Sequence, residues 1–116
     1  MKRAESALAL GLVAKTDEVF FEDLCFQLQQ AIEKAMKALL IYNDTEPPIT
    51  HSFAVLIREL RRTLEVPESI ERIIELEDYA VQTRYPGDYT PVDEIEYQDA
   101  SQIAKEVMSW IRSKIK

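Results

Sequence analysis

The sequence predicts an all-α protein, an up-down antiparallel helical bundle of about five helices on a four-helix core. The 116-residue chain contains only 2 glycines and 5 prolines, and many of its residues are good helix formers. Its apolar residues recur at alternating steps of three and four, which is the spacing of one helical face. We expect no strand, and residues 85–97 are the one segment where a short strand could form.

The strongest periodic pattern runs from about Val19 to Tyr42 and predicts the central helix. Two neighbouring apolar stripes cover most of its circumference. The first stripe comprises Phe21, Leu24, Leu28, Ala31, Ala35, Ala38 and Tyr42, and the second comprises Cys25, Ile32, Met36 and Leu39. The alanines allow another helix to approach closely. A narrow polar seam remains, expected to face solvent, a partner or a ligand, and formed by Asp23, Gln27, Gln30, Lys34 and Lys37.

Shorter helices are predicted on both sides of the central one. The first runs over about residues 3–14. A loop with two prolines at 47–48 leads to the third helix, for which Thr50 is the expected N-cap. The buried side of the third helix is expected to comprise Phe53, Leu56, Ile57, Leu60 and Leu64.

The last two helices are separated by a proline-glycine stop. The fourth is expected to hold Pro67 in its first turn and to end at Pro86-Gly87. Its predicted apolar positions are Ile70, Ile73, Ile74, Ala80 and Val81. The fifth follows a loop that runs to about Glu96. Its predicted inward positions are Ala100, Ile103, Ala104, Val107, Ile111 and Ile115.

Length and charge limit the classes of function. The chain fits one domain, residues 1–116. A formal net charge of −7 argues against extended DNA binding, because phosphates require a positive contact surface. It leaves room for a local basic site that holds one phosphate or a short RNA segment. No apolar run approaches the roughly 20 residues of a membrane span. Cys25, the single cysteine, fits a reducing compartment, and we expect a cytoplasmic protein with no membrane segment.

Four segments resemble the motifs of HEPN domains, and they occur in the family's order. Ala4-Glu5-Ser6-Ala7-Leu8 is similar to the first-helix motif, and residues 29–40, QQAIEKAMKALL, resemble the second-helix motif. Pro48-Ile49-Thr50-His51-Ser52-Phe53 resembles the proline-threonine-histidine turn that opens the third helix. Thr83-Arg84-Tyr85-Pro86, followed by Asp88, resembles the arginine-tyrosine-proline motif that ends the fourth.

The resemblance implies an up-down helical bundle that is commonly a homodimer. Many HEPN proteins are encoded beside a small nucleotidyltransferase and form a toxin–antitoxin-like pair with it. Ribonuclease members carry an arginine followed a few residues later by a histidine, and two subunits join these motifs in one cleft. Here Arg84 is present, but residues 85–91 contain no histidine, and Ala7 stands where many relatives have an acid. This departure puts ribonuclease activity in doubt.

Arg84 is the first candidate for a binding residue. Its planar guanidinium can hold a phosphate or a base edge through two hydrogen bonds. The alternative is a cation that complements the carboxyl end of a helix. Tyr85, Asp88 and Tyr89 follow it and could assist, although they are also ordinary turn residues.

His51 is the only histidine, so any imidazole chemistry must use it. The alternative is a residue hydrogen-bonded into the loop before the third helix. Lys34 and Lys37 lie on the polar seam, and Lys37 also forms a favourable i,i+4 pair with Glu33. We expect Arg84, His51 and Lys37 to come together in one cleft. Arg84 and His51 are weak catalytic candidates, and no metal site or cofactor is predicted, because no second histidine or cysteine cluster exists.

These residues support three hypotheses of function. The first is a nucleotide- or RNA-associated binding or regulatory module, a homodimer paired with a small nucleotidyltransferase. The second is a metal-independent ribonuclease toxin, for which Tyr89 is a poor acid–base group, because the unperturbed pKa of tyrosine is about 10. The third is a non-catalytic scaffold subunit.

Overall fold

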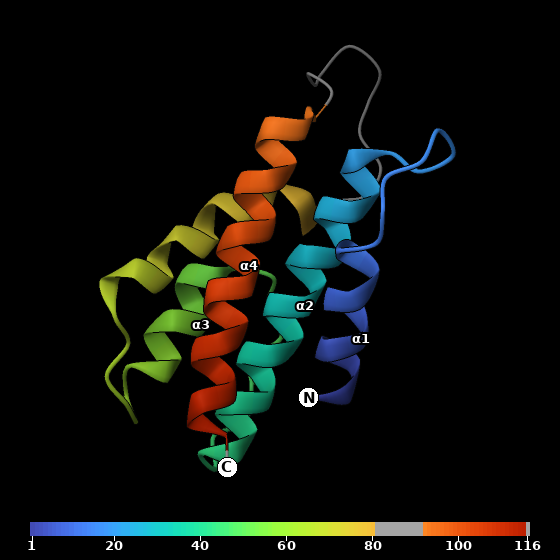
Figure 1. Cartoon of the computed structure of the whole chain (residues 1–116). Coiled ribbons are helices and arrows are strands. Elements are labelled where there is room, and N and C mark those ends of the chain that lie inside the picture. The colour runs from blue at the N-terminus through green and yellow to red at the C-terminus, as the bar shows by residue number, and fades with distance from the viewer. Residues whose placement is uncertain (81–91, 116) are drawn as a thin grey trace.

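The computed structural model in Figure 1 describes residues 1–80 and 92–115. These residues form α1 (Lys2–Gly11), α2 (Phe21–Tyr42), α3 (Phe53–Leu60), the 3₁₀ helix η1 (Glu68–Ala80) and α4 (Glu94–Lys114). They contain five helices and no strand, so the all-α prediction is confirmed. No helix among them is long and apolar enough to cross a membrane.

The helix α2 is the central element, as its two apolar stripes predicted. It contacts each of the other four helices, and its closest association is with α1, which runs antiparallel to it (Figure 1). Its buried apolar residues are Leu24, Cys25, Leu28, Ala31, Ile32, Ala35, Met36, Leu39 and Leu40. Tyr42 is 48% exposed, so its assignment to the buried face was wrong. It occupies the last turn of α2, where the helix ends.

The N-cap of α3 is not the predicted residue, Thr50. The N-cap is Ser52, whose side chain accepts a hydrogen bond from the backbone N–H of Val55. Thr50 accepts from the backbone N–H of Ser52 instead, so it stabilises the loop before the cap. The regular helix ends at Leu60, and Leu64, which was expected on its buried side, is half-buried in the segment that follows.

The buried residues of η1 follow a period of three. Ile70, Ile73, Leu76 and Tyr79 are buried, as expected for a 3₁₀ helix with three residues per turn. Ile74 lies off this stripe and is 41% exposed, so the prediction that placed it inward was wrong. The predicted position Val81 and the predicted stop at Pro86-Gly87 lie outside the described residues, and the side chain of Ala80 is not described.

The helix α4 begins at Glu94, two residues before the predicted start. Asp93 is its N-cap and accepts a hydrogen bond from the backbone N–H of Glu96 at 2.8 Å. The predicted inward residues Ala100, Ile103, Ala104, Val107 and Ile111 are buried, and Ile115 packs half-buried against the core. Tyr97 connects α4 to α1, because its hydroxyl donates to the carbonyl oxygen of Gly11 at 2.6 Å.

Candidate functional site

A buried carboxylate on the central helix is the focus of the site. Glu33 is only 5% exposed. Its Oε1 lies 2.7 Å from His51 Nδ1 and accepts a hydrogen bond of 3.1 Å from Gln29 Nε2. Its Oε2 accepts from Lys37 Nζ at 3.4 Å. Gln29, itself fully buried, accepts in turn from Gln30 Nε2 at 2.7 Å, so the carboxylate lies in a connected network.

Helical spacing explains why α2 supplies most of this network. Gln29, Glu33 and Lys37 are each four residues apart, and residues at this spacing lie on the same side of a helix. Neighbouring residues of α2 point into the apolar core, so this stripe carries polar groups into a largely buried region. Every buried side-chain nitrogen or oxygen of the described residues has a hydrogen-bond partner.

The amino end of α3 places His51 against the carboxylate. Glu77 of η1 accepts a hydrogen bond from the backbone N–H of Phe53 at 2.5 Å and lies 3.4 Å from that of Ala54. A carboxylate at this end of a helix satisfies amides that have no partner within the helix, and it complements the helix dipole. Together with the Ser52 cap, this contact fixes the start of α3 and therefore the loop residue His51 just before it.

The network consists of a buried carboxylate, Glu33, and two groups that solvent can reach, the ammonium of Lys37 and the imidazole of His51. The His51 side chain is 71% exposed, the Lys37 side chain is 27% exposed and the Glu33 side chain only 7%. A ligand approaching from solvent therefore meets the imidazole and the ammonium group before the carboxylate. Hydrogen bonds to the ionised carboxylate keep both side chains in place.

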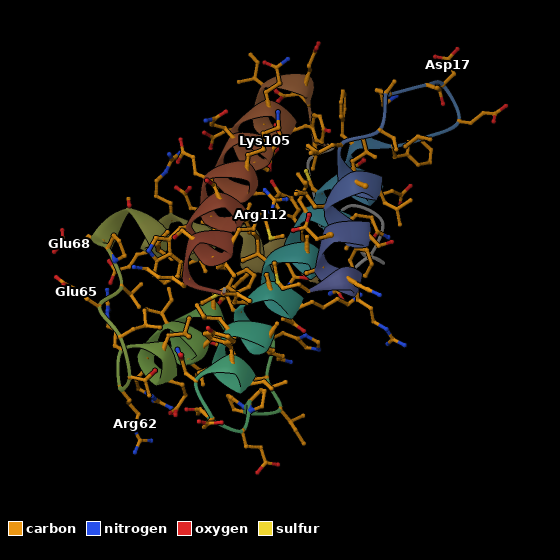
Figure 2. The ribbon with its side chains drawn as sticks, turned by 60° about the horizontal axis from the view of Figure 1, so that its bottom comes forward. Asp17, Arg62, Glu65, Glu68, Lys105 and Arg112 are labelled. Carbon is orange, nitrogen blue, oxygen red and sulfur yellow. The ribbon has the colours of Figure 1, made fainter. Side chains whose placement is uncertain are left out.

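Two other hollows on the surface are lined by none of the network residues Gln29, Glu33, Lys37 and His51. One, of about 420 Å³, is lined by Asp44, Thr45, Glu46, Glu59, Arg62 and Thr63. Arg62 projects outward at this end of the molecule in Figure 2. The other, of about 180 Å³, lies between η1 and α4 and has the acidic residues Glu75, Glu96 and Asp99 on its walls. Among the described residues, no three histidine, cysteine, aspartate or glutamate side chains gather in a way that could hold a metal ion.

Comparison with known families assigns the fold. The family model of the HEPN domain matches residues 1–114. The chain belongs to the HEPN family. HEPN domains are all-helical, commonly dimerise, and serve functions related to nucleotides and RNA, often as ribonuclease toxins. No curated protein and no solved structure matches the chain significantly.

In this HEPN domain the second and third motifs meet at the buried carboxylate. The motif at 29–40 lies within α2 and supplies Gln29, Glu33 and Lys37, and the motif at 48–53 supplies His51. The first motif contributes a contact elsewhere, because Glu5 on α1 pairs with Arg112 on α4. The fourth motif, at 83–86, lies outside the described residues.

The candidate residues of the HEPN site are only partly described. His51 and Lys37 were expected to lie together, and they do so through their shared contact with Glu33. The predicted pair of Glu33 and Lys37 is present at 3.4 Å. Lys34 is exposed and makes no hydrogen bond or ion pair with another described residue. The remaining candidates, outside the described residues, are Arg84, Tyr85, Asp88 and Tyr89.

Neither of the two buried polar residues of the network was predicted to belong to a site. Gln29 was not singled out, and Glu33 was considered only as the partner of Lys37. A signal was present, because a glutamine, a glutamate and a lysine at steps of four interrupt a helix that is otherwise apolar over most of its surface. Polar groups inside such a helix require hydrogen-bonding partners, and this requirement is itself a reason to look for a site.

Proposed function

We propose that this chain is one HEPN domain, residues 1–116, that binds a nucleotide or RNA at the surface carrying His51 and Lys37. In this proposal Arg84 completes the site, and Lys34, Tyr85, Asp88 and Tyr89 lie near the bound ligand. The observation that supports it best is the convergence of His51 and Lys37 on buried Glu33, where two family motifs meet. The protein acts as a binding or regulatory module rather than as an enzyme.

The chemistry of such a site is phosphate recognition by a few local cations. Lys37 offers an ammonium group, and Arg84 offers a guanidinium that can hold two phosphate oxygens at once. The net charge of −7 does not prevent this, because a cation in direct contact with a phosphate is screened little, whereas distant charges are screened within about 8–10 Å. The acidic surface restricts binding to this site and disfavours extended nucleic acid.

A fluorescence anisotropy titration with a labelled oligoribonucleotide tests the binding site. Arg84→Ala should weaken binding more than Lys37→Ala, and each should cost about 1.5–3 kcal/mol, the value of a hydrogen bond to a charged group. Lys105→Ala is the matched control, because Lys105 is an exposed cation on α4 (Figure 2). The proposal fails if wild type does not bind, or if the control weakens binding as much as the site variants do.

A metal-independent ribonuclease remains the alternative enzyme. One observation favours it: the single histidine is held by a carboxylate, the arrangement in which an imidazole acts as a general base. The absence of a histidine in residues 85–91 argues against it. We expect little cleavage of labelled RNA by wild type in the presence of a chelator. Robust cleavage that is lost in His51→Ala would establish the ribonuclease instead.

We also propose that the protein is a homodimer that pairs with a small nucleotidyltransferase in a toxin–antitoxin-like system. The family's common dimerisation supports the first part. Light scattering at micromolar concentration should give a mass above that of one chain, and a value near 13.4 kDa contradicts the dimer. Co-purification with a co-expressed small nucleotidyltransferase, followed by intact-protein mass analysis, tests the pairing. If the two proteins elute separately, the proposed pairing is wrong, and the chain is a non-catalytic scaffold subunit or binds another partner.

A further inference from the structure

The contact between His51 and Glu33 fixes the position of one imidazole proton. Glu33 Oε1 accepts from the Gln29 amide, and Glu33 Oε2 accepts from the Lys37 ammonium. An ionised carboxylate accepts hydrogen bonds at both oxygens and has no proton to donate. The 2.7 Å contact between His51 Nδ1 and Glu33 Oε1 therefore requires that Nδ1 carries the hydrogen.

The other ring nitrogen is then available to a ligand. In a neutral imidazole with its hydrogen on Nδ1, Nε2 has a lone pair and acts as a hydrogen-bond acceptor. His51 Nε2 has no hydrogen-bond partner among the described residues, and the side chain is 71% exposed. Because Glu33 is buried and held by Gln29, it keeps the ring from rotating to present Nδ1. A neutral His51 therefore accepts a hydrogen bond at Nε2 from a donor group of the ligand.

We propose that His51 Nε2 accepts a hydrogen bond from a ribose 2′-hydroxyl, so that the site prefers ribonucleotides to deoxyribonucleotides. This inference rests on the proposed function and specifies its ligand. Lys37 shares the same carboxylate with His51, so a phosphate-binding cation and a hydroxyl acceptor lie side by side. A ribonucleotide carries an anionic phosphate and a hydroxyl donor on one sugar, and a 2′-hydroxyl is the group that distinguishes RNA from DNA.

Glu33 is a positioning residue in this proposal, since it acts on the ligand only through His51. Glutamine has the same shape but carries only one terminal acceptor oxygen and no charge, and the Gln29 amide competes for that oxygen. The imidazole hydrogen is then held less firmly on Nδ1, so Nε2 is no longer fixed as an acceptor. Glu33→Gln should therefore reduce the preference for ribose, whereas a purely structural role of Glu33 would not change the ratio of the two affinities.

The test compares three fluorescein-labelled oligonucleotides of the same length and base: oligouridylate, oligodeoxyuridylate and 2′-O-methyl oligouridylate. The methylated sugar keeps the ribose-like pucker and an oxygen at the 2′ position but has no hydroxyl hydrogen. Wild type should bind oligouridylate about fivefold to tenfold more tightly than the other two, as expected for one hydrogen bond. This comparison uses the unmodified chain, so it does not depend on the folding of a variant.

Variants then test whether His51 and Glu33 cause the preference for ribose. His51→Phe and Glu33→Gln should lower the ratio of oligouridylate to oligodeoxyuridylate affinity to near one, with helical content checked by circular dichroism. Lys37→Ala should weaken both ligands and leave the ratio unchanged, because it contacts phosphate. Arg58→Ala is the matched surface control, since the Arg58 side chain on α3 is 72% exposed and close to the exposure of His51. It should leave the ratio unchanged.

The possible failures are distinguishable. If wild type binds the three oligonucleotides equally, and Lys37→Ala weakens all three, the proposed binding function stands and the ribose inference is overturned. The inference is also overturned if the methylated ligand binds as tightly as oligouridylate, because no hydroxyl hydrogen is then needed. If none of the three binds, both the proposed function and the inference fail.

Discussion

Arg112, near the end of α4, forms a two-pronged ion pair with Glu5, in the first turns of α1. The guanidinium Nε and Nη2 each donate to one carboxylate oxygen at 2.8 Å. This ion pair connects α1, the first helix of the chain, to α4, the last one. The hydrogen bond from Arg112 is the main reason that the pKa of Glu5 lies below its usual 4.5, and the same bond raises the pKa of Arg112.

The first prediction is that this ion pair makes a small, pH-dependent contribution to stability. Arg112→Met should lower the free energy of unfolding at pH 7 by about 0.5 kcal/mol, because both side chains are partly exposed to water. The pKa of Glu5 is lowered in the folded state, so the contribution is present above pH 4.5 and is lost as the pH falls through the lowered folded value. Urea unfolding at several pH values should show wild type and variant converging in acid.

Lys105→Met is the control for this prediction. Lys105 lies on the same helix (Figure 2), is exposed, and makes no ion pair with another described residue. Its substitution should have little effect at any of these pH values. A difference between wild type and Arg112→Met that persists unchanged below the folded pKa of Glu5 would show that the lost contribution is packing by the arginine stem.

The arrangement of helices could be predicted because it follows from local periodicity. The stripes of α2 and the inward positions 100–111 of α4 are sequence patterns, and burial follows them closely. One error lies where an assumption about the helical period failed. Ile74 was placed inward on a step of 3.6 residues, whereas Ile70, Ile73 and Leu76 recur at a step of three and are buried on a 3₁₀ helix.

The candidate site could be predicted only in part, because it depends on contacts between distant segments. The family-like motifs indicated His51 and Lys37. They did not indicate that Glu33 is buried, since a glutamate in a helix is usually at the surface. That position follows from the packing of α2 among the other helices and from the Glu77 contact that fixes the start of α3, neither of which is a local property of the sequence.

The second prediction concerns the hydroxyl that connects α4 to α1. Tyr97→Phe removes the 2.6 Å hydrogen bond to the Gly11 carbonyl and should lower the free energy of unfolding by about 1 kcal/mol. Burial, with a smaller effect from nearby Cys25, raises the pKa of Tyr97 above its usual 10.0. The phenol's contribution is therefore present below pH 10 and is lost as the pH rises through the folded value.

Urea unfolding of wild type and Tyr97→Phe at neutral and alkaline pH measures both effects. Their stabilities should approach each other as the pH rises above 10. Tyr42→Phe is the matched control, because Tyr42 is 48% exposed and its hydroxyl makes no hydrogen bond with another described residue. If Tyr97→Phe is as stable as wild type at neutral pH, the hydrogen bond to α1 contributes no more than the one to water that it replaces.

The third prediction is a stabilising substitution at the end of α2. Asp44 has a φ of 58°, a left-handed conformation that favours glycine. It occupies the position after the cap in a Schellman motif, in which Thr45 N–H donates to Leu40 and Asp44 N–H donates to Ile41. Asp44→Gly should therefore raise the free energy of unfolding by about 0.5–1 kcal/mol, measured by urea unfolding.

Glu46→Gly is the control for Asp44→Gly. Glu46 is exposed in the same loop, and its φ is not positive, so glycine there should only increase the freedom of the unfolded chain. It should leave stability unchanged or lower it slightly. A loss of stability in Asp44→Gly would mean that the aspartate side chain contributes more than the strain it imposes.

The last prediction tests whether the hydrogen bond between the buried side chains of Gln29 and Glu33 stabilises the fold. Glu33→Met removes the acceptor of Gln29, whose side chain is fully buried. An unsatisfied buried amide costs about 1–3 kcal/mol, so this variant should be destabilised by about that amount. His51 and Lys37 also lose a partner, but both reach solvent and can hydrogen-bond to water.

The double variant Gln29→Met/Glu33→Met should lose less stability than the sum of its two single variants. When both polar partners are replaced by apolar side chains of similar length, no buried donor or acceptor is left between them. Gln30, which donates to Gln29, is only half-buried and can turn to water. Urea unfolding of the four proteins gives the coupling energy, expected at about 1 kcal/mol or more. Additive losses would show that Gln29 and Glu33 stabilise the bundle independently, and the network would then be no more than two adjacent contacts.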